Sequence, residues 1–179
     1  MAGGTSVIAG LLLDGAWLSQ AHAAGARYQS DPRHAFADRI SDLLIPTTDT
    51  PGASAAGVAG FVLLALDSGV SGLKPALLDA VQAELDASAG GKFVGRPRNR
   101  QAGLLAELDR KAFAAASPAE NSAEFAWRRI KSAIVAGYYT SEIGGSKELI
   151  YEPVPGKFEN IALTAEYRAR SNDGQGGAI

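Results

Sequence analysis

The chain has 179 residues, of which 46% are hydrophobic and 20% are charged, and its formal net charge is −2. These values fit one globular domain with short tails, and they exclude the strongly basic surface that gathers nucleic acid. Because the sequence holds no cysteine and two histidines, a thiolate nucleophile, a disulfide, a cysteine-ligated cluster and a covalently attached c-type haem are excluded in this chain.

The first 23 residues are typical of an export signal. Residues 6–18 form an apolar stretch that is too short and too interrupted to span a membrane. The Ala-His-Ala sequence at residues 21–23 has the small-x-small form that predicts cleavage before Ala24. No Lys or Arg precedes Arg27, so we expect the true start, with a twin-arginine segment, to lie upstream of Met1. The alternative is a buried N-terminal helix.

Beyond residue 23 the hydrophobic spacing predicts an all-α fold, a compact bundle of about five helices. Expected helix starts lie near Asp31, at Thr50–Pro51, at Pro75, after a basic linker at residues 92–100, and at Ser117. Expected breaks are Pro46, Gly69 and the glycine pair at residues 90–91. The predicted buried faces carry Phe36, Ile40, Leu43 and Leu44; Val58, Phe61, Val62 and Leu66; Leu77, Leu78, Val81 and Leu85; Leu104, Leu105 and Leu108; and Trp127, Ile130, Ile134 and Tyr138.

The fifth helix has the clearest start signal. Ser117 precedes a proline and stands three residues before Glu120, which is the pattern of a capping box with Pro at the first helical position. We expect this helix to run from Ser117 to about Tyr139 and the glycines at residues 144–145 to stop it.

The C-terminal part changes character after residue 145. We assign residues 24–160 to one domain whose last part, from about residue 146, is an extended arm, because prolines there forbid a helix interior. Residues 161–179, whose last part from Ser171 is Gly-rich and polar, are expected to form a flexible tail. We expect the arm to bind across a partner, and the alternative is that it packs on the fifth helix.

Few residues in this chain could perform chemistry. No G-x-G-x-x-G loop is present, so a flavin or nicotinamide must bind elsewhere. Asp38 and Asp42 share a helix face and could do acid–base work, but a charged outer face is the better interpretation. His34 is expected in the first turn of a helix. The basic groups at residues 92–100 and 128–131 either steer an acidic partner or form ordinary solvated faces.

Two stretches carry motifs that belong together. The first is Ala-Asp-Arg-Ile at residues 37–40, Leu-Ile-Pro-Thr-Thr-Asp-Thr-Pro-Gly-Ala at residues 44–53, Ala-Gly-Val at residues 56–58 and Phe61. The second is Gly-Tyr-Tyr-Thr-Ser-Glu-Ile-Gly-Gly at residues 137–145 with Tyr-Glu-Pro-Val-Pro-Gly at residues 151–156. In this order they resemble the opening and the end of the gluconate 2-dehydrogenase subunit 3 family. Residues 73–113 match it only in helical pattern.

The resemblance implies a small, non-catalytic subunit of a membrane-associated, FAD-dependent sugar or sugar-acid dehydrogenase of bacteria. It implies a large flavoprotein partner of the glucose–methanol–choline type, which binds the FAD, and often a multihaem cytochrome c that carries haem c. It also implies a periplasmic location, reached through a twin-arginine signal on the small subunit. This chain itself would hold no cofactor or metal. The alternatives are a free-standing periplasmic chaperone or adaptor and a small hydrolase that uses His34 with a carboxylate.

The motif residues are better explained by geometry than by catalysis. Pro46 and Pro51 would fix an extended loop, and Gly52 would allow another backbone to approach closely. Tyr138 and Tyr139 are adjacent in a helix and lie about 100° apart, so one of them should be available to a partner. The candidate partner-binding residues are Ile45, Pro46, Pro51, Gly52, Tyr138, Tyr139, Gly144, Gly145, Tyr151, Pro153, Val154 and Pro155.

Overall fold

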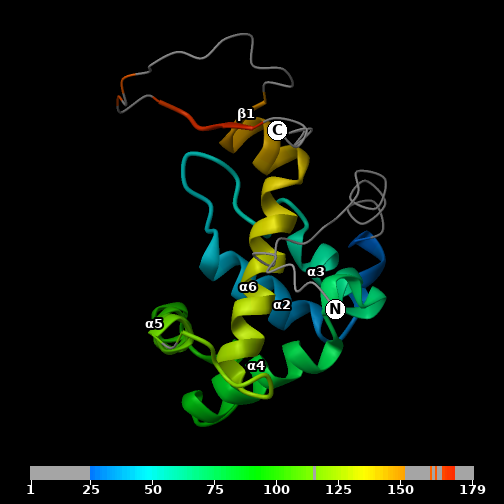
Figure 1. The fold of residues 1–179 in the computed structure, drawn as a ribbon, viewed down its shortest axis with the longest axis vertical. Helices are drawn as coiled ribbons and strands as arrows, with labels where there is room; N and C mark the ends of the chain where they lie inside the picture. The colour runs from blue at the N-terminus through cyan, green and yellow to red at the C-terminus, as the bar shows by residue number, and fades with distance from the viewer. Residues whose placement is uncertain (1–24, 115, 152–161, 163, 165–166, 172–179) are drawn as a thin grey trace, which may run out of the picture.

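The computed structural model describes residues 25–114, 116–151, 162, 164 and 167–171, so the predicted leader and most of the predicted arm and tail lie outside these residues. The all-α prediction is confirmed, because helices α2–α6 pack into a bundle (Figure 1). In chain order the elements are η1 Gly25–Ser30, α2 His34–Leu44, α3 Val58–Ser68, η2 Val70–Gly72, α4 Pro75–Ala89, η3 Phe93–Gly95, α5 Arg98–Ala114, α6 Ala123–Tyr139, η4 Gly144–Glu148, β1 Ile150–Tyr151 and β2 Arg170–Ser171.

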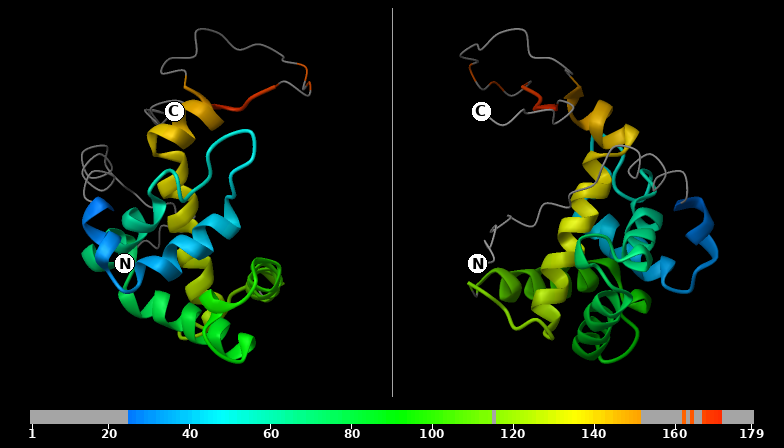
Figure 2. Two further views of the ribbon diagram at one scale, coloured as in Figure 1. Left: turned by 180° about the vertical axis from the view of Figure 1, so that it is seen from behind. Right: turned by 45° about the vertical axis from the view of Figure 1, so that its right-hand side comes forward.

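Helix α6 is the central element of the bundle. It runs along most of the molecule's length, and the other α-helices surround its lower part (Figures 1 and 2). It packs against α3, α4 and α5. The predicted seam, spaced at three- and four-residue steps, is fully buried, and its members are Trp127, Ile130, Ile134 and Tyr138. Burial of this one helical face therefore holds the bundle together.

The predicted helix boundaries at Pro75, Gly69 and Gly90 agree with those observed in the structure. Helix α4 begins at Pro75, as predicted, after Lys74 in extended conformation. Helices α3 and α4 end at Gly69 and Gly90, which adopt φ values of 69° and 66°. A side chain with a Cβ rarely adopts this left-handed conformation, so glycine at these positions sets the helix ends.

The predicted start of the second helix at Thr50–Pro51 is wrong, because α3 begins at Val58. The Ala53 backbone N–H donates to the Ile45 carbonyl oxygen at 2.9 Å, which closes the segment into a loop. Gly57 then turns the chain with a φ of 68° before α3 starts. The closure of the loop overrides the local helix signal at the proline.

The predicted start of the last long helix at Ser117 is also wrong, because α6 begins at Ala123. Its N-cap is Ser122, whose side chain accepts a hydrogen bond from the Phe125 backbone N–H at 3.1 Å. Arg128 donates to the carbonyl oxygens of Ala112 and Ala116 at 2.7 Å and 3.2 Å. These hydrogen bonds from α6 hold the connection before Ala123 in a non-helical conformation. The local sequence pattern does not predict this conformation.

Two further boundaries differ from the expectation. Residues 98–100 belong to α5 and not to the basic linker. Residues 144–148 form the π-helical turn η4, so extended backbone begins at Leu149. The Ile150 N–H donates to the Ala169 carbonyl oxygen at 2.8 Å, and β1 pairs in parallel with β2, with Ile150 opposite Arg170. The start of the arm is therefore joined to residues that the sequence assigned to the flexible tail.

Within the described residues, no single helix is both long and apolar enough to cross a membrane. The segments Val58–Ser68 and Val70–Ala89 reach that length and composition only as a pair, bent by 103°.

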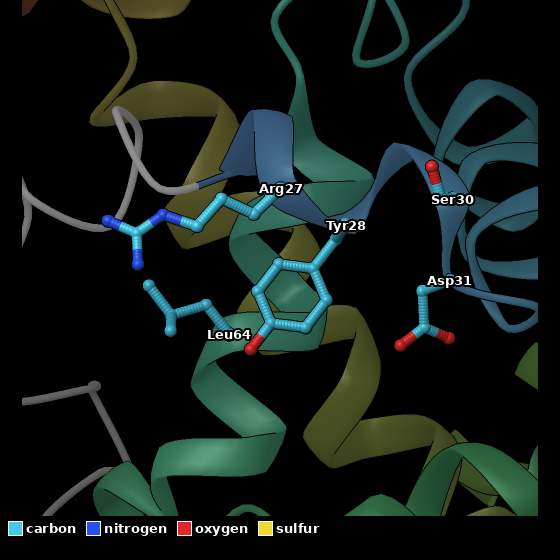
Figure 3. A pocket seen from close by; sticks show the side chains of 5 residues that line it. All are labelled: Arg27, Tyr28, Ser30, Asp31 and Leu64. Carbon is cyan, nitrogen blue, oxygen red and sulfur yellow. The ribbon is translucent and has the colours of Figure 1, made fainter.

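Arg33 joins the start of α2 to the end of α3. Its guanidinium donates to Asp31 at 2.7 Å and to Asp67 at 2.8 Å. Asp31 also lines a shallow pocket of about 440 Å³ together with Arg27, Tyr28, Ser30 and Leu64 (Figure 3). Hydrogen bonding to Arg33 lowers the pKa of Asp31 from 3.8 to about 2.

This ion pair predicts an acid-sensitive contribution to stability. A carboxyl with a lower pKa in the folded state takes up its proton preferentially in the unfolded chain. The stabilisation is complete above about pH 4 and is lost as the pH falls toward about 2. We expect the melting temperature of the wild type to fall more steeply over this range than that of D31N. D79N, at an exposed position of α4, should keep the wild-type slope, and parallel wild-type and D31N profiles would contradict the assignment.

Candidate functional site

The two motif stretches meet at one end of the bundle. The loop at residues 45–57 lies beside the end of α6 (Figure 2), and the Tyr138 hydroxyl donates to the Pro51 carbonyl oxygen at 2.8 Å. The Thr50 hydroxyl donates to the Glu148 carboxylate in η4. We call residues 45–57 and 137–148 the motif junction. The sequence analysis grouped these stretches by resemblance, and the structure brings them into contact.

The loop of the motif junction is closed by its own hydrogen bonds. The Gly52 N–H donates to the Thr47 hydroxyl at 3.1 Å, next to the bond from Ala53 to Ile45. A Cβ on Gly52 would lie 2.5 Å from the Ile45 carbonyl oxygen and 2.6 Å from the carbonyl carbon of Pro46. The close approach that Gly52 allows is therefore an approach of this chain's own backbone.

The other half of the junction is a tight turn, at residues 141–145, that folds the chain back over the end of α6. The buried Ser141 hydroxyl donates to the Tyr138 carbonyl oxygen at 2.6 Å and accepts from the Gly144 N–H at 3.0 Å. A Cβ on Gly144 would lie 2.0 Å from that same carbonyl oxygen. The Gly145 N–H completes the turn by donating to the Ser141 carbonyl oxygen at 2.8 Å. Glycine at residue 144 is thus a steric requirement of the turn.

The two tyrosines at the end of α6 have opposite environments. Tyr138 is 1% exposed and Tyr139 is 40% exposed, with their rings edge-to-face at 5.1 Å. Burial raises the pKa of Tyr138, and the charge of Glu148 raises it further, so the hydroxyl remains protonated as the donor to Pro51. Tyr138 therefore holds the junction together from inside, and Tyr139 is presented to solvent.

The remaining candidate residues divide by exposure. Pro46 is exposed; Ile45, Pro51 and Gly145 are half-buried. The side chain of Tyr151 and residues 153–155 lie outside the described residues. Sequence reasoning missed two exposed apolar side chains, Val135 and Ile150. Val135 could have been found, since it stands one helical turn before Tyr139.

Four carboxylates outside the junction make structural contacts, and they are Asp31, Asp38, Asp42 and Asp67. Asp38 accepts from the Ser54 hydroxyl at 2.8 Å, and Asp42 pairs with Arg98, so the two predicted acid–base carboxylates have separate partners. The lowered pKa values of Asp31 and Asp67 keep both ionised, which does not suit a general acid.

The next question is whether side chains that could bind a metal ion or act as a general base lie close together in the described residues. Among the described residues no group of three His, Asp or Glu side chains could hold a metal ion. His34 lies in the first turn of α2, as predicted.

The glycine at residue 52 gives a direct test of the junction's rigidity. G52A places a methyl group against backbone that cannot rotate away, so we expect it to lower the free energy of unfolding by about 1–3 kcal/mol. G103A is the control, because nothing lies within 4 Å of a Cβ at this helical position of α5. It should raise stability by about 0.5–1 kcal/mol. Denaturant unfolding measures both values, and equal effects would contradict the packing described.

One family of known proteins matches most of this chain. The profile of the family described as gluconate 2-dehydrogenase subunit 3 matches residues 31–156. No curated protein and no solved structure matches the chain. The matched residues make up well over half of the 179 and include both halves of the motif junction. The chain therefore belongs to the gluconate 2-dehydrogenase subunit 3 family.

Proposed function

We propose that the chain is the small, non-catalytic subunit of a periplasmic, FAD-dependent sugar or sugar-acid dehydrogenase. In this role it binds the large flavoprotein subunit, supports its maturation and accompanies it through the twin-arginine route. Family membership implies a complex with a dehydrogenase subunit. The flavoprotein of the glucose–methanol–choline type, its FAD and a multihaem cytochrome c with haem c are the proposed further components.

The observation that carries this proposal is the motif junction. The motif residues Pro51 and Tyr138 fix the loop to the end of α6 through a hydrogen bond. The motif residue Gly144 allows the tight turn that follows α6. Such a junction produces a loop and a helix end of fixed shape, with Tyr139 and Ile150 exposed beside it. A rigid surface with exposed aromatic and aliphatic side chains loses little conformational entropy on binding. These features support a binding role for this end of the molecule.

The start of the predicted arm directly follows the motif junction. Leu149 leaves η4 in extended conformation and leads to Ile150, whose side chain is 42% exposed. Two prolines follow at residues 153 and 155, and a prolyl segment has less entropy to lose when it binds. We propose that the arm contacts the large subunit next to the motif junction.

Co-purification tests the proposed partnership. The full chain, produced together with an FAD-dependent dehydrogenase subunit of the glucose–methanol–choline type from the same organism, should elute with it in a stable complex that contains FAD. The chain produced alone should show neither flavin absorbance nor dehydrogenase activity with an artificial electron acceptor, since it has no dinucleotide loop. An unrelated flavoprotein of the same type is the control. Separate elution of the two subunits would contradict the proposal.

N-terminal sequencing tests the export route. When the gene is expressed from an upstream start that includes paired arginines, mature periplasmic protein should begin at Ala24, because residues 21–23 have the small-x-small form of a cleavage site. Replacement of the arginine pair by lysines should retain the uncleaved protein in the cytoplasm. Periplasmic protein with an intact leader would contradict this route.

A further inference from the structure

The connection between α4 and α5 concentrates positive charge in a chain whose net charge is −2. Residues 92–100 contain four cations and no carboxylate, and we call them the basic segment. The cations are Lys92, Arg96, Arg98 and Arg100. Every residue of the basic segment is exposed except Phe93. The basic segment includes η3 and the first residues of α5, so the four charges lie on one short stretch of the chain.

Few of these positive charges are neutralised by carboxylates. Arg98 pairs with Asp42 of α2. Arg96 donates at 2.7 Å to the carbonyl oxygen of the residue that caps the end of α4. The ion pairs found among the described residues include neither Arg96 nor Lys92 nor Arg100. In the part of the chain that the structure describes, three of the four cations therefore have no carboxylate partner.

The backbone of the basic segment is fixed to the bundle from below. The Phe93 ring is fully buried and packs edge-to-face against Phe36, with 6.0 Å between the ring centres. The Phe93 N–H donates to the Asp86 carboxylate at 2.6 Å. The buried Gln101 side chain donates to the carbonyl oxygens of Phe93 and Val94, both at 3.0 Å. Even with this carboxylate and the α2 partner counted, four positive charges face two negative ones.

One apolar side chain is presented among these cations. Val94 is 39% exposed and stands two residues after Lys92 and two residues before Arg96. The single aromatic residue of the basic segment, Phe93, is buried. Protein–protein interface cores are enriched in aromatic side chains and depleted in lysine, so this composition fits a protein partner poorly. An anionic lipid surface attracts each Lys or Arg near it, and its interface accepts an aliphatic side chain.

We propose that the basic segment binds the surface of a membrane that contains anionic phospholipids. Lys92 and Arg100 bind headgroup phosphates, and Val94 enters the interface between headgroups and acyl chains. Each basic residue near an anionic surface strengthens binding about fivefold, so these few residues give a weak and reversible contact. The inference goes beyond the proposed function, because it assigns a lipid contact to this chain itself and does not depend on a dehydrogenase partner.

Charge reversal tests whether the basic segment makes the contact. In a sedimentation assay at about 50 mM salt, the full chain should bind vesicles of phosphatidylglycerol and phosphatidylcholine about tenfold or more tightly than vesicles of phosphatidylcholine alone. K92E should reduce this preference about tenfold. K74E makes the same charge change at an exposed lysine, separated from Lys92 by the length of α4, and should keep the preference within about twofold. Both variants should keep the wild-type circular dichroism spectrum, because both lysines are exposed.

A label at one site tests whether Val94 enters the lipid interface. Because the sequence holds no cysteine, V94C provides a single thiol for an environment-sensitive fluorophore. Its emission should shift to shorter wavelength with the anionic vesicles and return when salt is raised to about 500 mM. V135C is the matched control, since Val135 on α6 is 38% exposed, and its label should not shift.

Several results would overturn the lipid contact. Equal binding of the wild type to both kinds of vesicle would do so, and so would equal effects of K92E and K74E. A shift of the label at residue 135 without one at residue 94 would place the contact elsewhere. A label at residue 94 that ignores the vesicles but responds to the dehydrogenase subunit would assign the basic segment to a protein contact instead. The vesicle assays contain no dehydrogenase subunit, so their failure leaves the proposed function standing.

Discussion

The hydrogen bond from the Tyr138 hydroxyl to the Pro51 carbonyl oxygen, 2.8 Å long, is the contact on which the motif junction depends. It joins the last turn of the central helix to a loop that lies 87 residues earlier in the sequence. Because the Tyr138 ring is fully buried, loss of this donor would leave a carbonyl group without its partner and free the loop from α6. The turn at Gly144 starts from the carbonyl group of the same tyrosine.

This arrangement explains how a chain with few catalytic residue types can still have a specific role. Two of the family motif residues, Gly52 and Gly144, are present because a Cβ would collide with backbone. The side chains left exposed next to them, above all Tyr139, face solvent with their backbone already fixed. Preorganisation of this kind favours the binding role proposed above, because each flexible residue that is ordered on binding reduces the affinity.

The buried faces of α2–α6 were largely predictable from spacing, whereas some boundaries and the site itself were not. Four residues predicted on those faces are only half-buried, and they are Leu43, Leu44, Leu77 and Leu104. Pro75 predicted the start of α4 correctly, since its fixed φ suits the first helical position after the extended Lys74. Pro51 gave an equally good signal, but the bond from Ala53 to Ile45 closes a loop there. Ser117 and Ser122 are both good N-caps, and the choice between them depends on bonds that Arg128 makes to the end of α5. The exposure of Tyr139 followed from helical geometry, but no local pattern encodes the contact between Tyr138 and Pro51.

Site-specific photo-crosslinking tests the central claim most directly, namely that the end of α6 beside the motif junction faces the large subunit. A photoreactive phenylalanine analogue placed at Tyr139 keeps an aromatic ring at that position, and the same group at Val94 is the control. The account predicts that, in the assembled complex, illumination links residue 139 to the flavoprotein and leaves residue 94 unlinked. Linkage from residue 94 without linkage from residue 139 would contradict it.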